Sequence, residues 1–264
     1  MPTIAHISDL HFGREVPEVM HGLMNALADI QPELVIISGD LTQRAKVEEF
    51  EAAKAFLQQL PYPYFIVPGN HDLSATDITE RFFKPWDKWQ QFVTPNLEPI
   101  LQTDYAIVVG VNTARAAGFY FDWSRGQISA AQIEFVATTI KPIGEEKLRL
   151  VVAHHPFWLP QQAEYRDVIQ NRDQAIEVFQ ESGVDIILSG HIHMAYTQIL
   201  KGVIISHAGT TFSNRTLETH PNSFNIIKGN REQLVISFME WEKDGFQLKE
   251  NKLFKRINSH WQLI

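Results

Sequence analysis

Five short clusters of aspartate, asparagine and histidine punctuate this chain. They contain Asp9 and His11, Asp40, Asn70 and His71, His154 and His155, and His191 and His193. Together they supply carboxylate oxygen, amide oxygen and imidazole nitrogen, which suit borderline to hard divalent metals such as Mn, Fe or Zn. A glycine directly precedes three of these residues and fits sharp turns and close backbone approach. The sequence therefore predicts a metal site.

The first and last clusters each place two candidate ligands two residues apart. In an extended segment, residues i and i+2 point to the same side, so we expect each pair to aim at one spot. With either His154 or His155 included, the candidates outnumber the four ligands of a tetrahedral zinc. They divide naturally over two ions if one carboxylate bridges both. Two such ions clamp the attacking and leaving oxygens in phosphoryl displacement.

The overall charge limits the class of substrate. Acidic residues number 31 against 23 Lys plus Arg, a formal net charge of -8 with the 11 His counted as neutral. That sign disfavours binding to extended nucleic acid. Two dications beside Asp9 and Asp40 would still leave a local charge of about +2, enough to attract a small phosphate ester.

Composition excludes several other classes of protein. The chain has no cysteine, so it can form neither a disulfide framework, a Cys-based zinc site nor a catalytic thiol. No apolar run approaches 18 residues, so we expect no membrane-spanning helix. The N-terminal residues lack a basic stretch followed by a long apolar one, and we therefore expect a cytoplasmic protein.

Each polar cluster directly follows an apolar run of strand length, and amphipathic stretches lie between the runs. Strands before the clusters are predicted at 4–7, 34–37, 64–67, 148–153 and 184–188; further strands at 105–111, 203–206, 223–227, 234–241 and 246–248; and helices at 16–30, 47–60, 129–140 and 173–182. This alternation is typical of an α/β fold, in which ligands bind beyond the carboxyl ends of the strands. With no linker or repeat, we expect a single domain over residues 1–264.

Predictions also follow for four further regions. The aromatic residues between 79 and 92 have helical spacing, which favours one helix packed on the core. Segment 156–170, with Phe157, Trp158 and Tyr165, is read as core or plain loop in preference to a platform for a base. His207 follows a strand and is a lesser candidate for the site. The C-terminal strands from Phe224 onward either complete the second sheet or form a dimer edge.

In this order, the clusters resemble the calcineurin-like metallophosphoesterase superfamily. The matching motifs, from residue 4 to about 215, are Asp9-x-His11, Gly39-Asp40, Gly69-Asn70-His71-Asp72, His154-His155-Pro156 and Gly190-His191-x-His193. The second and third look most like the class III cyclic-nucleotide phosphodiesterase branch. The resemblance implies a four-layer α/β/β/α sandwich, with two sheets inside and helices outside.

The resemblance also assigns the ligands to two divalent ions. It gives Asp9, His11 and His193 to one ion and Asn70, His154 and His191 to the other, with Asp40 bridging both. His154 is preferred to His155 because the family's ligand lies two residues before the proline. His71 corresponds to a non-ligand catalytic histidine that contacts the scissile phosphate. Asp72 either tunes His71 or serves the turn.

The implied activity is hydrolysis of a small, cyclic-nucleotide-like phosphodiester by in-line attack of metal-held hydroxide. A protonated His71 would help the leaving alkoxide depart. A phosphomonoesterase or nuclease with the same site is the alternative, and a non-catalytic binding scaffold of the same fold is a remote one. We expect a small phosphate-ester substrate, no extended nucleic acid, no membrane partner, and a homodimer as one option for assembly.

Overall fold

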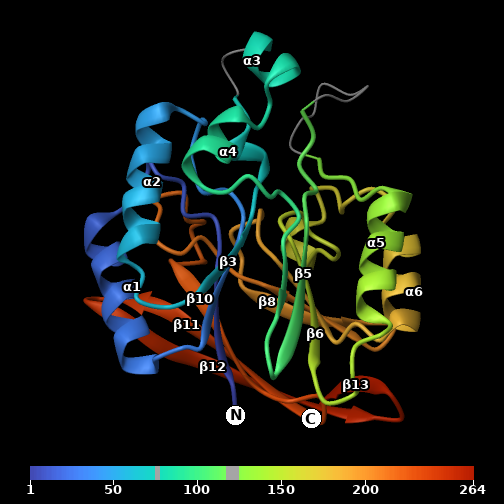
Figure 1. Ribbon diagram of the computed structural model, residues 1–264. Helices are drawn as coiled ribbons and strands as arrows, with labels where there is room; N and C mark the ends of the chain where they lie inside the picture. The colour runs from blue at the N-terminus through green and yellow to red at the C-terminus, as the bar shows by residue number, and fades with distance from the viewer. Residues whose placement is uncertain (75–77, 117–124) are drawn as a thin grey trace.

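Two β-sheets lie face to face between pairs of helices in the computed structural model, which describes residues 1–74, 78–116 and 125–264 (Figure 1). The first sheet has seven strands in the order β13-β12-β11-β10-β1-β2-β3, and the second has six in the order β4-β5-β6-β7-β9-β8. The strands are β1 Thr3–Ile7, β2 Leu34–Ser38, β3 Tyr64–Val67, β4 Ile100–Gln102, β5 Ala106–Val111, β6 Leu148–Ala153, β7 Ile186–Ser189, β8 Tyr196–Leu200, β9 Val203–His207, β10 Ser223–Gly229, β11 Gln233–Glu242, β12 Gly245–Ile257 and β13 His260–Leu263. The α-helices are α1 Pro17–Ile30, α2 Val47–Gln59, α3 Ile78–Phe83, α4 Asp87–Phe92, α5 Ala130–Ile140 and α6 Arg172–Ser182, and short 3-10 helices span Asn70–Asp72 and Gln161–Ala163.

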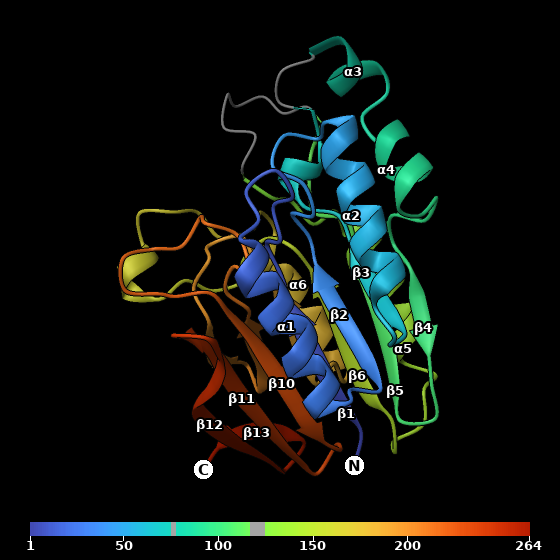
Figure 2. The same cartoon turned by 90° about the vertical axis from the view of Figure 1, so that its left-hand side faces the viewer.

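Three apolar layers hold this arrangement together. Helices α1 and α2 cover the outer face of the seven-stranded sheet, and α5 and α6 cover the outer face of the six-stranded sheet (Figures 1 and 2). On β2, Val35 and Ile37 pack toward the helices while Leu34 and Ile36 pack toward the other sheet. A strand buried on both faces has a continuous apolar sequence, which is why these runs could be recognised. The predicted α/β/β/α sandwich is confirmed.

The strands that precede the polar clusters run parallel within each sheet. β1, β2 and β3 are parallel neighbours in the first sheet, and β5, β6, β7 and β9 are parallel neighbours in the second. Their carboxyl ends therefore meet at one edge, and the labelled chain termini lie at the opposite end of the molecule (Figure 1). This common edge positions the candidate site.

The predicted aromatic helix over residues 79–92 is wrong as a single helix. The chain forms α3 and α4 instead, with Pro85 between them, where a proline interrupts helical hydrogen bonding. Trp89 is fully buried, but Phe82 and Phe83 are 48% and 82% exposed. Core packing is thus correct for Trp89 and wrong for the two phenylalanines.

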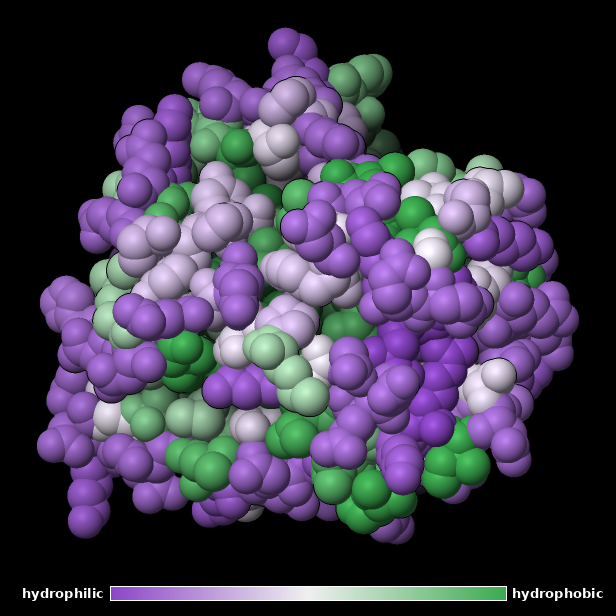
Figure 3. Space-filling view, turned by 60° about the horizontal axis from the view of Figure 1, so that its bottom comes forward, coloured by the Kyte–Doolittle hydropathy of each residue, from purple (hydrophilic) through white to green (hydrophobic). Residues whose placement is uncertain are grey.

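The C-terminal strands extend the first sheet and not the second. β10 pairs antiparallel with β1, and β11, β12 and β13 continue outward from it. β12 is far longer than the predicted 246–248. The prediction was too short because most of its side chains are exposed, and only its pairing with β11 defines it as a strand. The view toward the lower end of the molecule shows a largely hydrophilic surface with separate apolar patches (Figure 3). Within the described ranges, no helix has the length and apolar character that a bilayer crossing requires.

Candidate metal centre

The strand ends bring all seven predicted metal ligands into two adjoining groups. The first group is Asp9, His11 and His193, whose ligand atoms all lie within 4.8 Å of one another. Asp9, Asp40 and His154 form another such set, as do His154, His155 and His191. Residues up to 184 positions apart in the sequence therefore share one small volume.

In the first group, potential metal-ligand atoms lie close to one another. His193 Nε2 lies 3.2 Å from Asp9 Oδ1 and 3.2 Å from His11 Nε2. Asp9 Oδ1 is buried and has no hydrogen-bond partner among the described residues. A buried carboxylate oxygen without a partner is costly unless a proton or a cation satisfies it. The donor set of one carboxylate and two imidazoles fits a divalent metal.

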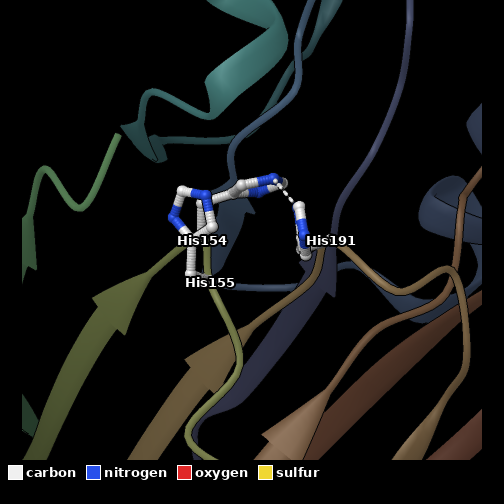
Figure 4. A group of neighbouring side chains, drawn as sticks. All are labelled: His154, His155 and His191. Carbon is white, nitrogen blue, oxygen red and sulfur yellow. Dashed lines mark hydrogen bonds between the residues drawn. The ribbon is translucent and has the colours of Figure 1, made fainter. Parts of the chain in front are cut away.

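The second group consists of Asn70, His154 and His191. His191 Nδ1 lies 3.0 Å from Asn70 Oδ1 and 3.3 Å from His154 Nε2. Figure 4 shows His154 and His155 projecting from the end of β6, with the dashed line joining His154 to His191. His154 Nε2 also lies 3.2 Å from Asp40 Oδ2.

Asp40 connects the two groups. Its Oδ2 lies 3.7 Å from His11 Nε2 on one side and 3.2 Å from His154 Nε2 on the other. The second oxygen, Oδ1, accepts a hydrogen bond of 2.8 Å from the backbone N–H of His71. One carboxylate oxygen is thus fixed and the other is presented to both groups, which is the arrangement a bridging ligand needs.

The contacts of the neighbouring histidines favour His154 over His155 as a ligand. His154 Nδ1 donates to the Ser38 carbonyl at 2.8 Å, which directs Nε2 toward Asp40. His155 uses Nδ1 to bond the Thr113 hydroxyl at 2.7 Å. Its ring remains close to that of His191, with centroids 4.8 Å apart. The ligand assignment itself stays a prediction.

The backbone at the site is not extended, so the assumed geometry is wrong, although Asp9 and His11 do lie in one group as expected. Asp9, His11, Asp40, His191 and His193 all adopt positive φ, between 47° and 76°. His191 and His193 consequently point into different groups instead of sharing one. Such left-handed conformations are unfavourable for residues with a Cβ and concentrate at functional sites.

Close approach of the loops explains two of the glycines. A Cβ on Gly39, where φ is +95°, would lie 2.6 Å from His154 Nδ1. A Cβ on Gly190 would lie 1.9 Å from the Ser8 hydroxyl oxygen and 2.3 Å from Asp9 Oδ2. Neither position has room for a side chain.

Asp72 braces the loops that carry Asp40 and Asn70. Its carboxylate accepts backbone hydrogen bonds of 2.8 Å from Gly69, 2.8 Å from Thr42 and 3.2 Å from Leu41. These bonds tie the turn after β3 to the turn after β2. The turn role is the one its contacts support.

The pKa values of three candidate ligands favour the deprotonated forms that bind cations. Burial would raise the pKa of Asp9, but His193, His11 and His154 hold it well below its usual range. Burial would also raise the pKa of Asp40, but His154 and His71 hold it well below its usual range. Burial lowers the pKa of His11 to about 4. These are the protonation states that metal binding requires.

His154 is the exception among the ligand candidates. Burial alone would lower its pKa, but the Asp40 carboxylate outweighs burial and raises the pKa to about 9. A metal bound at this position would replace that proton and take over the pairing with Asp40.

The open side of the groups forms a pocket of about 280 Å³, which includes His71 and two arginines that were not predicted. His71 Nδ1 donates to the Gln43 carbonyl at 2.8 Å, and its Nε2 accepts from Arg215 Nη1 at 2.9 Å. Arg166, from segment 156–170, is the other arginine that lines the pocket. No strand end or glycine motif marks either residue, so the sequence offered no signal for them.

The rest of segment 156–170 is mostly structural, as expected. Phe157 is fully buried, and the Trp158 ring packs against Tyr196 with centroids 5.2 Å apart. Tyr165 is 77% exposed. Arg166 is therefore this segment's contribution to the pocket.

A second layer of histidines lies beneath the centre. His207 forms a hydrogen bond of 2.7 Å with the Ser189 hydroxyl and stacks on Tyr196. It belongs to none of the sets of potential metal ligands described above. His6 bonds the Ser38 hydroxyl at 2.8 Å. Burial lowers the pKa of both histidines to about 3.

This chain belongs to the calcineurin-like phosphoesterase family, whose model matches residues 2–195. A probable glycerophosphodiester phosphodiesterase, GpdQ, of Arcobacter nitrofigilis is 23% identical over 68% of this chain and 63% of its own length. A probable cyclic nucleotide phosphodiesterase of Coxiella burnetii is 22% identical over 98% of this chain and 96% of its own length. The chain thus spans less than two thirds of the GpdQ relative.

Solved structures share the fold at low sequence identity. A purple acid phosphatase from yellow lupin superimposes with a TM-score of 0.70 at 14% identity, over 95% of this chain and 53% of that chain. A dimetal phosphatase from Danio rerio gives a TM-score of 0.66 at 10% identity, over 96% and 98% of the two chains. These likenesses establish the sandwich and leave the substrate open.

We predict that His154→Ala and His155→Ala differ in metal content. Loss of His154 removes a ring that faces Asp40 and His191, so the variant should bind less manganese per chain than the parent. His155→Ala should keep the parent stoichiometry. Metal analysis after manganese loading and desalting checks this, with circular dichroism to verify folding. A folded His154→Ala protein with full metal content would transfer the ligand role to His155.

We also predict that metal-free protein loses stability as pH falls from about 6.5 toward 3. His6 and His207 stay neutral when folded but bind protons when unfolded, so acid favours the unfolded chain. In His6→Gln one of these protons is absent, so the variant should lose less stability in acid. Relative to the parent, its free energy of unfolding should rise by about 1.4 kcal/mol for each unit by which the pH falls in that window. Urea unfolding at several pH values measures it. His21→Gln, at an exposed position on α1, is the control, and parallel curves for parent and His6→Gln would contradict the prediction.

Proposed function

We propose that this protein is a binuclear-metal phosphoesterase that hydrolyses small phosphodiesters of cyclic-nucleotide type. The observation that carries the proposal is the pair of lone-pair groups joined by Asp40, open on one side to a small pocket lined by basic residues. A pocket of about 280 Å³ suits a small substrate and not a polymer. The phosphodiesterase names of the similar proteins support the same class of substrate.

Two divalent ions, Mn, Fe or Zn, would occupy the groups. One would be held by Asp9, His11 and His193, and the other by Asn70, His154 and His191, with Asp40 shared. Such ions polarise phosphoryl oxygens and lower the pKa of bound water, which is the chemistry that phosphate-ester hydrolysis needs.

The protein's own groups fix this centre before substrate arrives. The Nδ1 hydrogens of His154 and His193 are engaged by backbone carbonyls of Ser38 and Arg215, so each Nε2 is aimed inward. The ligands therefore need little rearrangement to bind cations, and preorganised groups of this kind are the main source of electrostatic catalysis.

His71 is the group we propose for contact with the scissile phosphate and the leaving oxygen. It lines the pocket, and its backbone N–H fixes Asp40. In the substrate-free structure its Nδ1 carries the hydrogen and Nε2 accepts, so service as a proton donor requires that Nε2 take up a proton once substrate binds.

Activity with and without metal tests the proposal. Bis-p-nitrophenyl phosphate, p-nitrophenyl phosphate, cyclic AMP and single-stranded DNA should be compared at equal protein and manganese concentrations. We expect the two small diesters, bis-p-nitrophenyl phosphate and cyclic AMP, to be preferred, chelation to abolish turnover, and manganese to restore it. Preference for the monoester or for DNA would replace the diesterase assignment with its alternative, and turnover that survives complete metal removal would refute the mechanism.

We predict that His71→Ala retains both ions and loses most turnover. Removal of a general acid lowers the rate by about 10²–10⁴-fold, while the Asp40 hydrogen bond survives because it uses the backbone of residue 71. Manganese-supported kinetics and metal analysis on the same preparation measure the two effects. His21→Ala serves as the control for a histidine far from the pocket. If His71→Ala lost its metal, His71 would be a ligand instead.

A further inference from the structure

Arg215 is the one basic side chain among the described residues with a hydrogen bond to His71. It lies on the loop between β9 and β10, outside every motif block, and its Nη1 lies 2.9 Å from His71 Nε2. The same nitrogen lies 3.5 Å from Gln43 Oε1 and 3.5 Å from His11 Nε2. The guanidinium thus lies on the pocket side of the first ligand group.

The loop that carries Arg215 is firmly anchored to the site. The Arg215 carbonyl accepts a 2.6 Å hydrogen bond from His193 Nδ1. Thr210, earlier on the loop, donates to the Asp9 carbonyl at 2.7 Å, and Asn222 binds the Ser213 carbonyl at 2.8 Å. The loop backbone that carries Arg215 is therefore held by two candidate ligand residues, Asp9 and His193.

The charge of Arg215 has no counterpart within the described part of the chain. Every ion pair found there involves other residues, and the hydrogen bonds of its guanidinium all use Nη1. A guanidinium offers five N–H donors in a planar fork that matches phosphate oxygens. A half-buried cation beside a site built for cations is unfavourable unless an anion joins it.

We propose that Arg215 is a catalytic residue that binds a non-bridging oxygen of the scissile phosphate, next to His71. The inference rests on the proposed function and deepens it. Asp40 and the other candidate ligands would hold the metal ions, and Arg215 would contact the phosphate from the side of His71 and Gln43. Arg215 thereby supplies permanent positive charge next to His71, whose Nε2 accepts its hydrogen bond.

The test uses Arg215→Ala and Arg215→Lys, with Arg44→Ala as a control because Arg44 is exposed and adjoins Gln43. Substitution removes the guanidinium but keeps the carbonyl that holds His193, so manganese content should remain at the parent value. Inorganic phosphate binding to manganese-loaded protein, measured by calorimetry, should weaken at least about tenfold in Arg215→Ala. kcat/KM should fall by about 10²–10³-fold, as for removal of one oxyanion donor.

Arg215→Lys should recover part of the phosphate affinity, and added guanidinium should raise the turnover of Arg215→Ala but not of the parent. Phosphate affinity and kcat/KM within twofold of the parent in Arg215→Ala would overturn the proposal. Loss of metal in that variant would also overturn it and make Arg215 a structural support of His193. If the parent hydrolyses no ester, the proposed function fails. The calorimetric measurement of phosphate binding would still decide whether Arg215 binds phosphate.

Discussion

The structure depends on holding several buried carboxylate oxygens and imidazole nitrogens close together at the strand ends. Asp9 Oδ1, His11 Nε2 and His193 Nε2 lie 3.2 to 3.7 Å from one another, and Asp9 Oδ1 has no hydrogen-bond partner among the described residues. Similar crowding surrounds Asp40 and His154. The packed sheets, the glycines without room for a Cβ and the carbonyls that orient the rings all serve to keep these atoms together. Cations are the natural way to satisfy them.

The sequence was informative where burial and chemistry coincide. Apolar runs such as 34–37 sit in the interior on both faces, so their identity as strands could be predicted, and the polar residues after them had to lie at the strand ends. The strand β12 was mostly missed, because its exposed side chains carry no apolar pattern and only pairing with β11 defines it. The prediction of core packing was wrong for Phe82 and Phe83, because aromatic residues with helical spacing are buried only where another element covers them.

For the site, composition of the clusters was a better guide than their local geometry. The seven ligand candidates do converge, but through positive φ at positions such as His191 and His193 and not through extended backbone. Arg215 could not have been found at all, because its place depends on how a loop after β9 folds back over β1. Long-range contacts of that kind leave no periodic trace in the sequence.

Each ligand group draws from both sheets. Asp9 and His11 follow β1 of the first sheet and meet His193 from beyond β7 of the second, while Asp40 and Asn70 meet His154 and His191 in the same way. Neither group exists until residues as many as 184 positions apart in the sequence have come together. An ion bound there closes very long loops and restricts the conformational entropy of the chain as a cross-link does. Such an ion would hold the two sheets together at the edge where the candidate ligands meet.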